Sequence, residues 1–352
     1  MDLPKKTKAA ILFEQKKPLR IENISLPEEL SYGQVLVKIN YSGICGSQIG
    51  EIDGVKGEDK YLPHLLGHEG SGIVLKVGEG VSTVKVDDEV ILHWREGDGI
   101  NSALPTYMLD DISVNAGWVT TFNQYAVISE NRLTSISKGI DQVQAPLLGC
   151  ALTTGFGVIE NDANLKIGES VVIFGSGGVG LSMIQAAKLR GAYPIIAVDK
   201  YEGRLELAEK CGADYSLLSN DIDLVLKEII NLTNNSLDVF IDNTGVPQVI
   251  ESGYSLVKKT GKLILVGVPK FDKSIRIHSL PMHFGKTIKG SEGGNCNPAI
   301  DIPKLTTLLD KGRLDITDQV TKICGLNDIN DAISDMKTGK ANGRIIIDLN
   351  TT

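Results

Sequence analysis

The sequence predicts an α/β protein of two domains, one rich in β-strands and one built around a doubly wound parallel sheet. The chain has 352 residues, which is more than one hydrophobic core usually organises. Up to about Ser137 it carries short β-like runs separated by turn residues, whereas from Ser170 continuous apolar strands alternate with helical periods. Such alternation is typical of a parallel sheet that helices cover on both faces.

The N-terminal region has the pattern of the β-rich domain. Its β-like runs include Gln34–Ile39 and Gly72–Val77, and turn residues such as Gly78–Gly80 and Asp87–Asp88 lie between such runs. We therefore expect this region to consist mostly of short strands joined by turns.

The region after Ser170 predicts the parallel sheet. A helical period at Val179–Arg190 joins the first two strands. Four apolar runs suit buried strands, namely Ser170–Phe174, Ile195–Val198, Leu237–Asp242 and Lys262–Gly267. Together they indicate repeated strand–helix units.

The last segment mixes both patterns. It has helical stretches at Ile302–Lys311 and Ile329–Lys337 and a final strand at Arg344–Asp348. Sequence alone does not say which domain that strand joins.

Composition and charge disfavour several classes of protein. The 36 basic and 44 acidic residues give a net charge of -8, and no Lys/Arg stripe with interleaved aromatics occurs, so nucleic acid is not an expected partner. No run of 18 apolar residues occurs and no signal-peptide core follows the basic start, so no membrane partner is expected. Five scattered cysteines suit a reducing compartment. The expected location is the cytoplasm.

A glycine-rich turn predicts a dinucleotide-binding site. Gly175, Gly177 and Gly180 form the pattern G-x-G-x-x-G, with Gly178 and Val179 between the last two, directly after an apolar strand and before a helical period. In such a unit the glycines allow the tight turn, the approach of backbone to the pyrophosphate and close helix packing. The alternative, a tight turn that binds nothing, is disfavoured by this context.

An acidic residue follows at the spacing that the ribose of NAD requires. Asp199 lies 19 residues after Gly180, at the end of the next strand. A carboxylate there accepts hydrogen bonds from the ribose hydroxyls and repels a 2′-phosphate, which favours NAD over NADP. Lys200 and Arg204 follow closely and could soften that preference.

Three residues are candidate metal ligands: Cys45, His68 and Cys150, each beside a glycine. Catalytic zinc takes three protein ligands and leaves a fourth position open, and two cysteines with one histidine form one known set. The candidates are separated by 22 and 81 residues, so tertiary structure must bring them together. Taken singly, Cys150 would more often be a buried apolar residue and His68 a hydrogen-bonded turn histidine.

The segment Gly67–Gly72, with Gly78 after it, resembles the signature of zinc-containing alcohol dehydrogenases of the medium-chain dehydrogenase/reductase superfamily. Cys45–Ser47 is similar to the first-ligand motif, and Gly149–Cys150 with Thr153–Gly155 is similar to the third-ligand motif. The resemblance covers nearly the whole chain. It implies a GroES-like β-rich catalytic domain over residues 1–152, a Rossmann domain over 153–294 and a return segment over 295–352 that completes the catalytic domain.

The resemblance implies a role for each residue of the metal site. Cys45, His68 and Cys150 would hold one catalytic zinc. Glu69 would lie next to the metal, and Ser47 would hydrogen-bond the substrate hydroxyl and begin a proton relay.

The resemblance also extends the cofactor site. Gly267 and Val268 match the family's nicotinamide-contact loop, and Arg344 matches a position that contacts the cofactor pyrophosphate. It further implies a homodimer or homotetramer assembled through the cofactor domains.

The chain departs from the family in three places. No cysteine lies between Cys45 and Cys150, so we expect no four-cysteine structural zinc, and Arg95–Gly117 must be held by packing and hydrogen bonds. Gln48 replaces the acid that usually orients the ligating histidine. Gly50 and Glu51 stand where some relatives have a histidine that ends the proton relay, so protons must leave another way, through Glu51 or a water chain.

Three aromatic residues fall where relatives line the substrate pocket: Trp94, Trp118 and Phe122. Packing in a core is the equally weighted alternative for them. His93 and Arg95, which flank Trp94, hint at a polar or anionic substrate such as a sugar alcohol, an aminocyclitol or a phosphorylated polyol.

These observations predict a zinc-dependent oxidoreductase that transfers a hydride between an alcohol and NAD. One alternative is a zinc-free quinone or enone reductase of the same superfamily, which the three ligand candidates disfavour. The other is a non-catalytic scaffold of the same fold, supported only by the missing relay residues.

Overall fold

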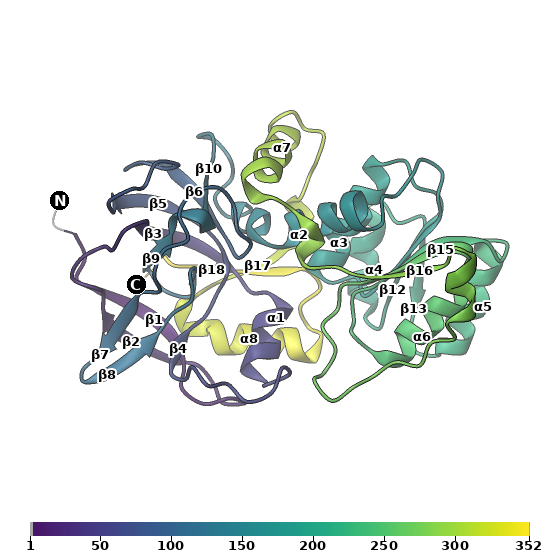
Figure 1. The fold of residues 1–352 in the computed structure, drawn as a ribbon, viewed down its shortest axis with the longest axis horizontal. Helices are drawn as coiled ribbons and strands as arrows, with labels where there is room; N and C mark the ends of the chain where they lie inside the picture. Colours follow the sequence, from purple (N-terminus) through teal and green to yellow (C-terminus); the bar gives the residue numbers. More distant parts are fainter. Residues whose placement is uncertain (1–2, 352) are drawn as a thin grey trace. The chain divides into compact units, whose positions relative to one another are not determined.

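The computed structural model describes residues 3–351, so residues 1, 2 and 352 of the expected domains lie outside the described part. The chain divides into two compact units (Figure 1). One unit combines Met1–Cys150 with Asn297–Thr352, and the other is Ala151–Cys296. Within residues 3–351, no helix is long and apolar enough to cross a membrane.

The unit that contains both chain ends is rich in β-structure. Its strands are β1 (Lys6–Leu12), β2 (Arg20–Ser25), β3 (Gln34–Gly43), β4 (His64–Leu65), β5 (Glu69–Val77), β6 (Glu89–His93), β7 (Thr106–Leu109), β8 (Ile112–Asn115), β9 (Tyr125–Ser129), β10 (Leu133–Ser135), β17 (Val320–Gly325) and β18 (Arg344–Asp348). A closed barrel links β1-β2-β7-β8-β4, and a seven-stranded sheet has the order β10-β6-β5-β3-β18-β17, with β9 also on β3. The β-rich GroES-like domain of the expectation is confirmed.

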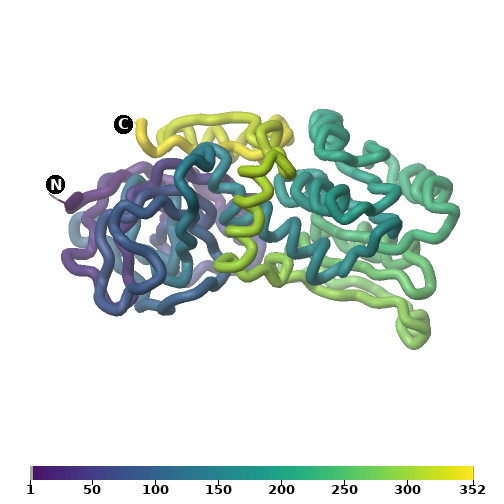
Figure 2. Tube along the Cα trace, turned by 90° about the horizontal axis from the view of Figure 1, so that it is seen from above, coloured from purple at the N-terminus to yellow at the C-terminus, as the bar shows by residue number. Residues whose placement is uncertain are grey.

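The final strand joins this β-rich unit. In β18, Ile346 lies opposite Gly43 of antiparallel β3, and β18 also runs parallel to β17. Figure 2 shows the yellow C-terminal segment beside the purple and blue N-terminal segments. Because β3 and β18 are neighbours, residues that are about 300 positions apart in the chain lie side by side in this unit.

Strand β3 is buried on both faces because alternate side chains enter different cores. Val35, Val37 and Ile39 pack in the larger core of the unit, whereas Leu36 packs in the core of the barrel. This two-sided burial explains why Gln34–Ile39 reads as an almost continuous apolar run.

The helices of this unit are α1 (Gly46–Ile52), α7 (Pro298–Asp310) and α8 (Ile329–Thr338). The expected helix at 302–311 begins earlier, at Pro298, because the Asn297 side chain caps it by accepting from the N–H of Ala299. A proline in the first turn costs no helical hydrogen bond.

The second unit is built around a parallel sheet with the order β13-β12-β11-β14-β15-β16. Its strands are β11 (Val171–Phe174), β12 (Ile195–Asp199), β13 (Tyr215–Leu218), β14 (Leu237–Asp242), β15 (Val257–Leu265) and β16 (Thr287–Gly290). Its helices are α2 (Ala151–Gly157), α3 (Gly178–Leu189), α4 (Glu202–Cys211), α5 (Ile222–Leu232) and α6 (Pro247–Leu256).

Helices cover both faces of this sheet. Val171 and Ile173 of β11 pack in one core with Ile184 of α3, whereas Val172 and Phe174 pack in the opposite core. The expected doubly wound Rossmann sheet is confirmed.

Two loops of the β-rich unit, one before β6 and one after it, are held by one buried carboxylate. Glu130 has no exposed surface. Its Oε1 accepts from the backbone N–H groups of Ser82 and Thr83 at 2.6 and 2.8 Å, and its Oε2 accepts from the N–H of Ile100 at 2.8 Å. Hydrogen bonds from both loops to a single side chain thus hold this part of the unit together.

Candidate functional site

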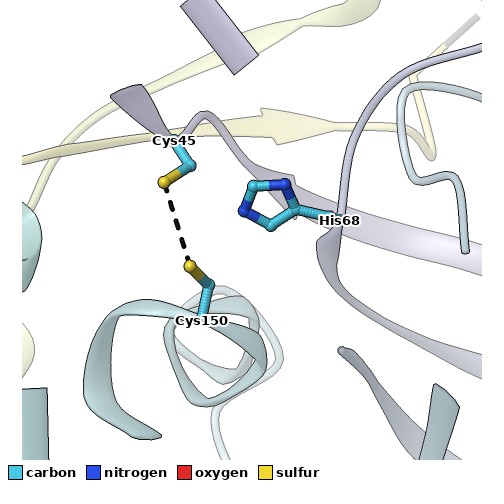
Figure 3. A group of neighbouring side chains, drawn as sticks. All are labelled: Cys45, His68 and Cys150. Atoms are coloured by element: carbon cyan, nitrogen blue, oxygen red, sulfur yellow. Dashed lines mark hydrogen bonds between the residues drawn. The ribbon is translucent and has the colours of Figure 1, made fainter. Parts of the chain in front are cut away.

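The three candidate metal ligands come together in the β-rich unit. Cys45 follows β3 and lies at the N-terminus of α1, His68 directly precedes β5, and Cys150 ends the turn of 3-10 helix Ala145–Gly149. Their ligand atoms lie within 4.8 Å of one another. Figure 3 shows the two sulfur atoms and the His68 ring facing a common space.

A glycine sets the backbone next to the histidine. Gly67 has φ +90°, and a Cβ there would collide with Thr121 and with the backbone of Phe122. Only glycine adopts this conformation without strain. The close approach positions His68 at the start of β5.

The two cysteines form an asymmetric pair with their Sγ atoms 3.8 Å apart. The hydrogen bond from Cys150, together with the nearby Arg344 charge, holds the pKa of Cys45 well below its ordinary value. The same hydrogen bond, together with burial, raises the pKa of Cys150 well above its ordinary value. In the absence of a metal the hydrogen bond thus favours the negative charge on Cys45 over Cys150, whereas as zinc ligands both would be thiolates.

Behind the cysteines lies a buried ion pair. Nη1 of Arg344 is 3.4 Å from Oε1 of Glu69 and donates to the carbonyl of Ile44 at 2.9 Å. Glu69 has no exposed surface, and Arg344 has 3%. Burial alone lowers the pKa of Arg344, but the charges of Glu69 and the cysteines raise it above its ordinary value. The ion pair thus fixes the guanidinium of Arg344, and with it a positive charge, beside the ligand sulfurs.

The residues fit a bound zinc ion. Nε2 of His68 is buried and has no hydrogen-bond partner among the described residues. Two thiols and one imidazole are the soft and borderline donors that zinc prefers, and three protein ligands leave one position for substrate. Cys45, His68 and Cys150 would hold the metal.

Gln48 occupies the position of the missing acid. It is buried, and its Nε2 lies 2.9 Å from Nδ1 of His68 and 3.3 Å from Oε2 of Glu51. Ser47, one residue earlier in α1, is exposed. Its contact with a substrate hydroxyl stays a prediction.

The aromatic residues lie in different environments. Phe122 has no exposed surface and packs in the larger core of the unit, so the structure gives it a packing role. Trp118 is 40% exposed, and its Nε1 donates to the carbonyl of Ser102. Trp94 lies 5.5 Å from the guanidinium of Arg95. Their place in a substrate pocket stays a prediction.

The partners of Arg344 lie within the β-rich unit. Its guanidinium is buried in the β-rich unit and is directed at Glu69 and Ile44. The carboxylate and the carbonyl there account for its orientation. Contact with the cofactor stays a prediction.

The glycine-rich turn lies between β11 and α3, as its pattern predicts. A Cβ at Gly180 would collide with the carbonyl of Gly175, whereas one at Gly177 would meet only open space. No side chain caps the N-terminus of α3. Open backbone at a helix N-terminus fits the pyrophosphate of a dinucleotide.

Asp199 ends β12 beside this turn. Its Oδ2 accepts from the N–H of Ser176 at 2.8 Å and lies 3.7 Å from Nη1 of Arg204. Both Arg204 and Lys200 have their cationic groups 4.8 Å from the ring of Tyr201. The Arg204 guanidinium thus lies at the carboxylate that is expected to hold the ribose.

A second polar turn beside the glycines was not predicted. Buried Asp242, at the end of β14, accepts from the N–H groups of Thr244 and Gly245, and Asn243 donates to the carbonyl of Gly175 at 3.0 Å. Gly267 lies against this turn, and Val268 is 54% exposed. Polar residues at the carboxyl ends of parallel strands were the available sequence signal.

Comparisons with known proteins agree with this geometry. The zinc-binding dehydrogenase family model matches residues 178–311, and the alcohol dehydrogenase GroES-like domain model matches residues 31–138. An S-(hydroxymethyl)glutathione dehydrogenase of Synechocystis sp. is 30% identical, covering 96% of this chain and 98% of that protein. An Escherichia coli protein of the same name is 29% identical over the same shares.

Solved structures show the same fold over nearly the whole chain. Benzyl alcohol dehydrogenase from Acinetobacter calcoaceticus is 28% identical with a TM-score of 0.88, covering 98% of this chain and 99% of that one. The 2R,3R-butanediol dehydrogenase from Bacillus subtilis is 28% identical with a TM-score of 0.78, covering 97% and 99%. This chain belongs to the zinc-containing alcohol dehydrogenase family of the medium-chain dehydrogenase/reductase superfamily.

Proposed function

We propose that this protein is a zinc-dependent oxidoreductase that transfers a hydride between an alcohol and NAD. The group of Cys45, His68 and Cys150, whose two cysteines are buried, carries the proposal, because it offers a catalytic zinc ligand set within 4.8 Å. Bound zinc would polarise the substrate oxygen and favour the alkoxide, and bound nicotinamide would exchange the hydride. The ligands that are present disfavour the zinc-free reductase.

The protein's own residues tune the metal ligands and position the substrate. The hydrogen bond from Cys150 and the charge of Arg344 favour the thiolate form of Cys45, and Glu69 balances the arginine within the buried site. Ser47 is exposed in the first turn of α1, two residues after Cys45. Its Oγ accepts the substrate hydroxyl proton in a hydrogen bond.

The decisive experiment compares two cysteine variants. Cys45→Ala should lower bound zinc from one per chain to nearly none and reduce NADH formation by about 10³-fold, because the metal supplies several kcal/mol of charge stabilisation. Cys324→Ala, which removes a thiol from β17, should change neither quantity. Undiminished activity of Cys45→Ala would refute the proposal, and two zincs per wild-type chain would contradict a single catalytic site.

For the substrate, we propose a polar or anionic alcohol such as a sugar alcohol, an aminocyclitol or a phosphorylated polyol. Arg95 beside Trp94 supports this choice, whereas His93 is buried and gives no support. Relatives are named for S-(hydroxymethyl)glutathione, benzyl alcohol and butanediol. NADH formation should therefore be measured with those substrates beside the polyols. Higher kcat/KM for a simple alcohol than for every polyol would refute the choice.

We also propose a cytoplasmic homodimer or homotetramer assembled through the cofactor units. Edge strand β16 and the neighbouring exposed Leu280 and Phe284, each 54% exposed, support an interface on that unit. Light scattering of the purified protein should give the mass of two or four chains. A monomer at micromolar concentration would refute this assembly.

A further inference from the structure

Helix α1 contributes to the metal site the ligand Cys45 and two further polar side chains. Cys45 is the N-cap residue of α1, and Gln48 and Glu51 follow three and six positions later. Because residues three apart lie on one face of a helix, both side chains project along the same side. That side meets the segment His64–His68, which ends in the second ligand.

The inner contact of this face is made by Gln48, which is 6% exposed. Its Oε1 accepts from the N–H of Gly67 at 2.5 Å, and its Nε2 lies 2.9 Å from Nδ1 of His68. One amide group therefore contacts both the backbone before the ligand and the ring of the ligand. With zinc on Nε2, the proton of the ring would lie on Nδ1 and need the amide oxygen as its acceptor.

The outer contact is made by Glu51, His64 and Asp59. Oε2 of Glu51 accepts from Gln48 at 3.3 Å, and its Oε1 lies 4.0 Å from Nε2 of His64. That nitrogen lies 2.7 Å from Oδ2 of Asp59, and Nδ1 of His64 lies 2.9 Å from the carbonyl of Leu65. The side chains of His64 and Asp59 are 9% and 10% exposed. Both ring nitrogens face acceptors, which holds His64 in one orientation.

A separate cation site is the competing interpretation of the outer group, whose ligand atoms lie within 4.8 Å. Two ligands of one small cation, each about 2.1 Å from it, lie about 3 Å apart. The 2.7 Å between His64 and Asp59 is instead a charge-assisted hydrogen-bond distance. Hydrogen bonding therefore explains the group better than metal binding.

We propose that Gln48, Glu51, His64 and Asp59 form a clamp that fixes His68 relative to Cys45 and so sets the zinc affinity of the site. The inference rests on the proposed function, because it concerns the same metal. Gln48 and Glu51 are positioning residues that act through His68. In other zinc sites a single carboxylate orients the ligating histidine. Here two contacts do so, one between Gln48 and His68 and one between Glu51 and Gln48.

The test measures zinc dissociation constants of the full-length protein by competition with a chelator. Gln48→Ala should weaken zinc binding by about 10- to 100-fold, the usual effect of losing a partner of a ligating histidine. Glu51→Ala should weaken it by a smaller factor in the same direction. Glu58→Gln, an exposed acid in the loop before His64, should bind zinc as the wild type does.

An exchange of partners separates orientation from simple loss of packing. The variant Gln48→Glu/Glu51→Gln keeps the pair with donor and acceptor reversed, and it should recover most of the affinity lost in Gln48→Ala. The visible absorption of the cobalt-substituted protein should shift in Gln48→Ala and return in the exchanged variant. Neither readout depends on turnover.

The outcomes distinguish the clamp from the proposed function. A wild type that binds no zinc overturns both. A wild type that binds zinc and oxidises alcohols, with Gln48→Ala and Glu51→Ala unchanged in affinity and cobalt spectrum, overturns the clamp alone. If Gln48→Ala does not fold, Glu51→Ala and the exchanged variant still decide the matter.

Discussion

Two buried glutamates of the β-rich unit have their charge compensated in different ways. Glu69 and Glu130 both have no exposed surface. Glu69 faces the guanidinium of Arg344 at 3.4 Å, whereas Glu130 accepts from neutral N–H and O–H groups of Ser82, Thr83 and Ile100. The first carboxylate is balanced by a full charge and the second by dipoles.

The two kinds of charge compensation follow from the neighbours of each carboxylate, which are metal ligands at Glu69 and loops at Glu130. Near Glu69 the ligand sulfurs need a positive charge that lowers their proton affinity, and Arg344 supplies it to Cys45. Near Glu130 there is only backbone to fix. Burial raises the pKa of Glu130, but the hydrogen bonds from Ser82, Ile100 and Thr83 outweigh it and lower the pKa. A charge pair therefore belongs to the reactive region and a hydrogen-bonded anion to the scaffold.

The largest expected effect comes from removing the Glu69 charge. Glu69→Gln leaves Arg344 buried without its carboxylate and should lower the free energy of unfolding by about 4 kcal/mol. Urea denaturation of the zinc-loaded protein measures it. The double variant Glu69→Gln/Arg344→Met should recover part of the loss, because it also removes the buried cation. A change below about 1 kcal/mol in Glu69→Gln would mean that the sulfurs alone balance Arg344.

A smaller effect is expected in the scaffold. Glu130→Gln places an amide group against several N–H donors and should lower the free energy of unfolding by about 3 kcal/mol. Its zinc content and kcat should stay at wild-type values, unlike those of Cys45→Ala. The matched control is Asp98→Asn, an exposed acid in the same lobe. Loss of zinc from a folded Glu130→Gln protein would contradict the separation of the two regions.

The parts of the protein that sequence could predict are those with a local pattern. The turn at Gly175, Gly177 and Gly180 with Asp199 follows strand, helix and spacing, so periodicity located it. The metal ligands lie far apart in the chain, and only the resemblance around His68 joined them. Sequence did establish the loss of the acid at Gln48.

Contacts between residues far apart in the chain could not be predicted from the sequence. Glu130 is a single acid after a strand, and its partners lie about 30 and 47 residues away. Phe122 fits a pocket or a core equally well until its burial is known. The pairing of Glu51 with His64 depends on how the loop between them folds back. No periodicity in the sequence records such contacts.

The smallest expected effect is a pH dependence of stability, and it follows from comparing one histidine in each region. Burial lowers the pKa of His68, but the Cys45 thiolate outweighs it and raises the pKa. In the scaffold, burial lowers the pKa of His93 from 6.5 to about 4. The neutral His93 ring fits its site, because Nδ1 lies 2.8 Å from the carbonyl of Arg95 and Nε2 lies 3.0 Å from Oγ1 of Thr134.

The sign of the pH effect follows from the lowered pKa of His93. The unfolded chain takes up a proton near pH 6.5 while the folded protein does not, so stability is full above that value and falls as the pH drops towards 4. Between pH 7 and 5 the wild type should lose about 2 kcal/mol more than His93→Gln, whose side chain does not titrate. Urea denaturation across this range measures the difference. Parallel pH profiles for the two proteins would show that His93 is protonated in the fold, and the scaffold would then hold a buried charge as the metal region does.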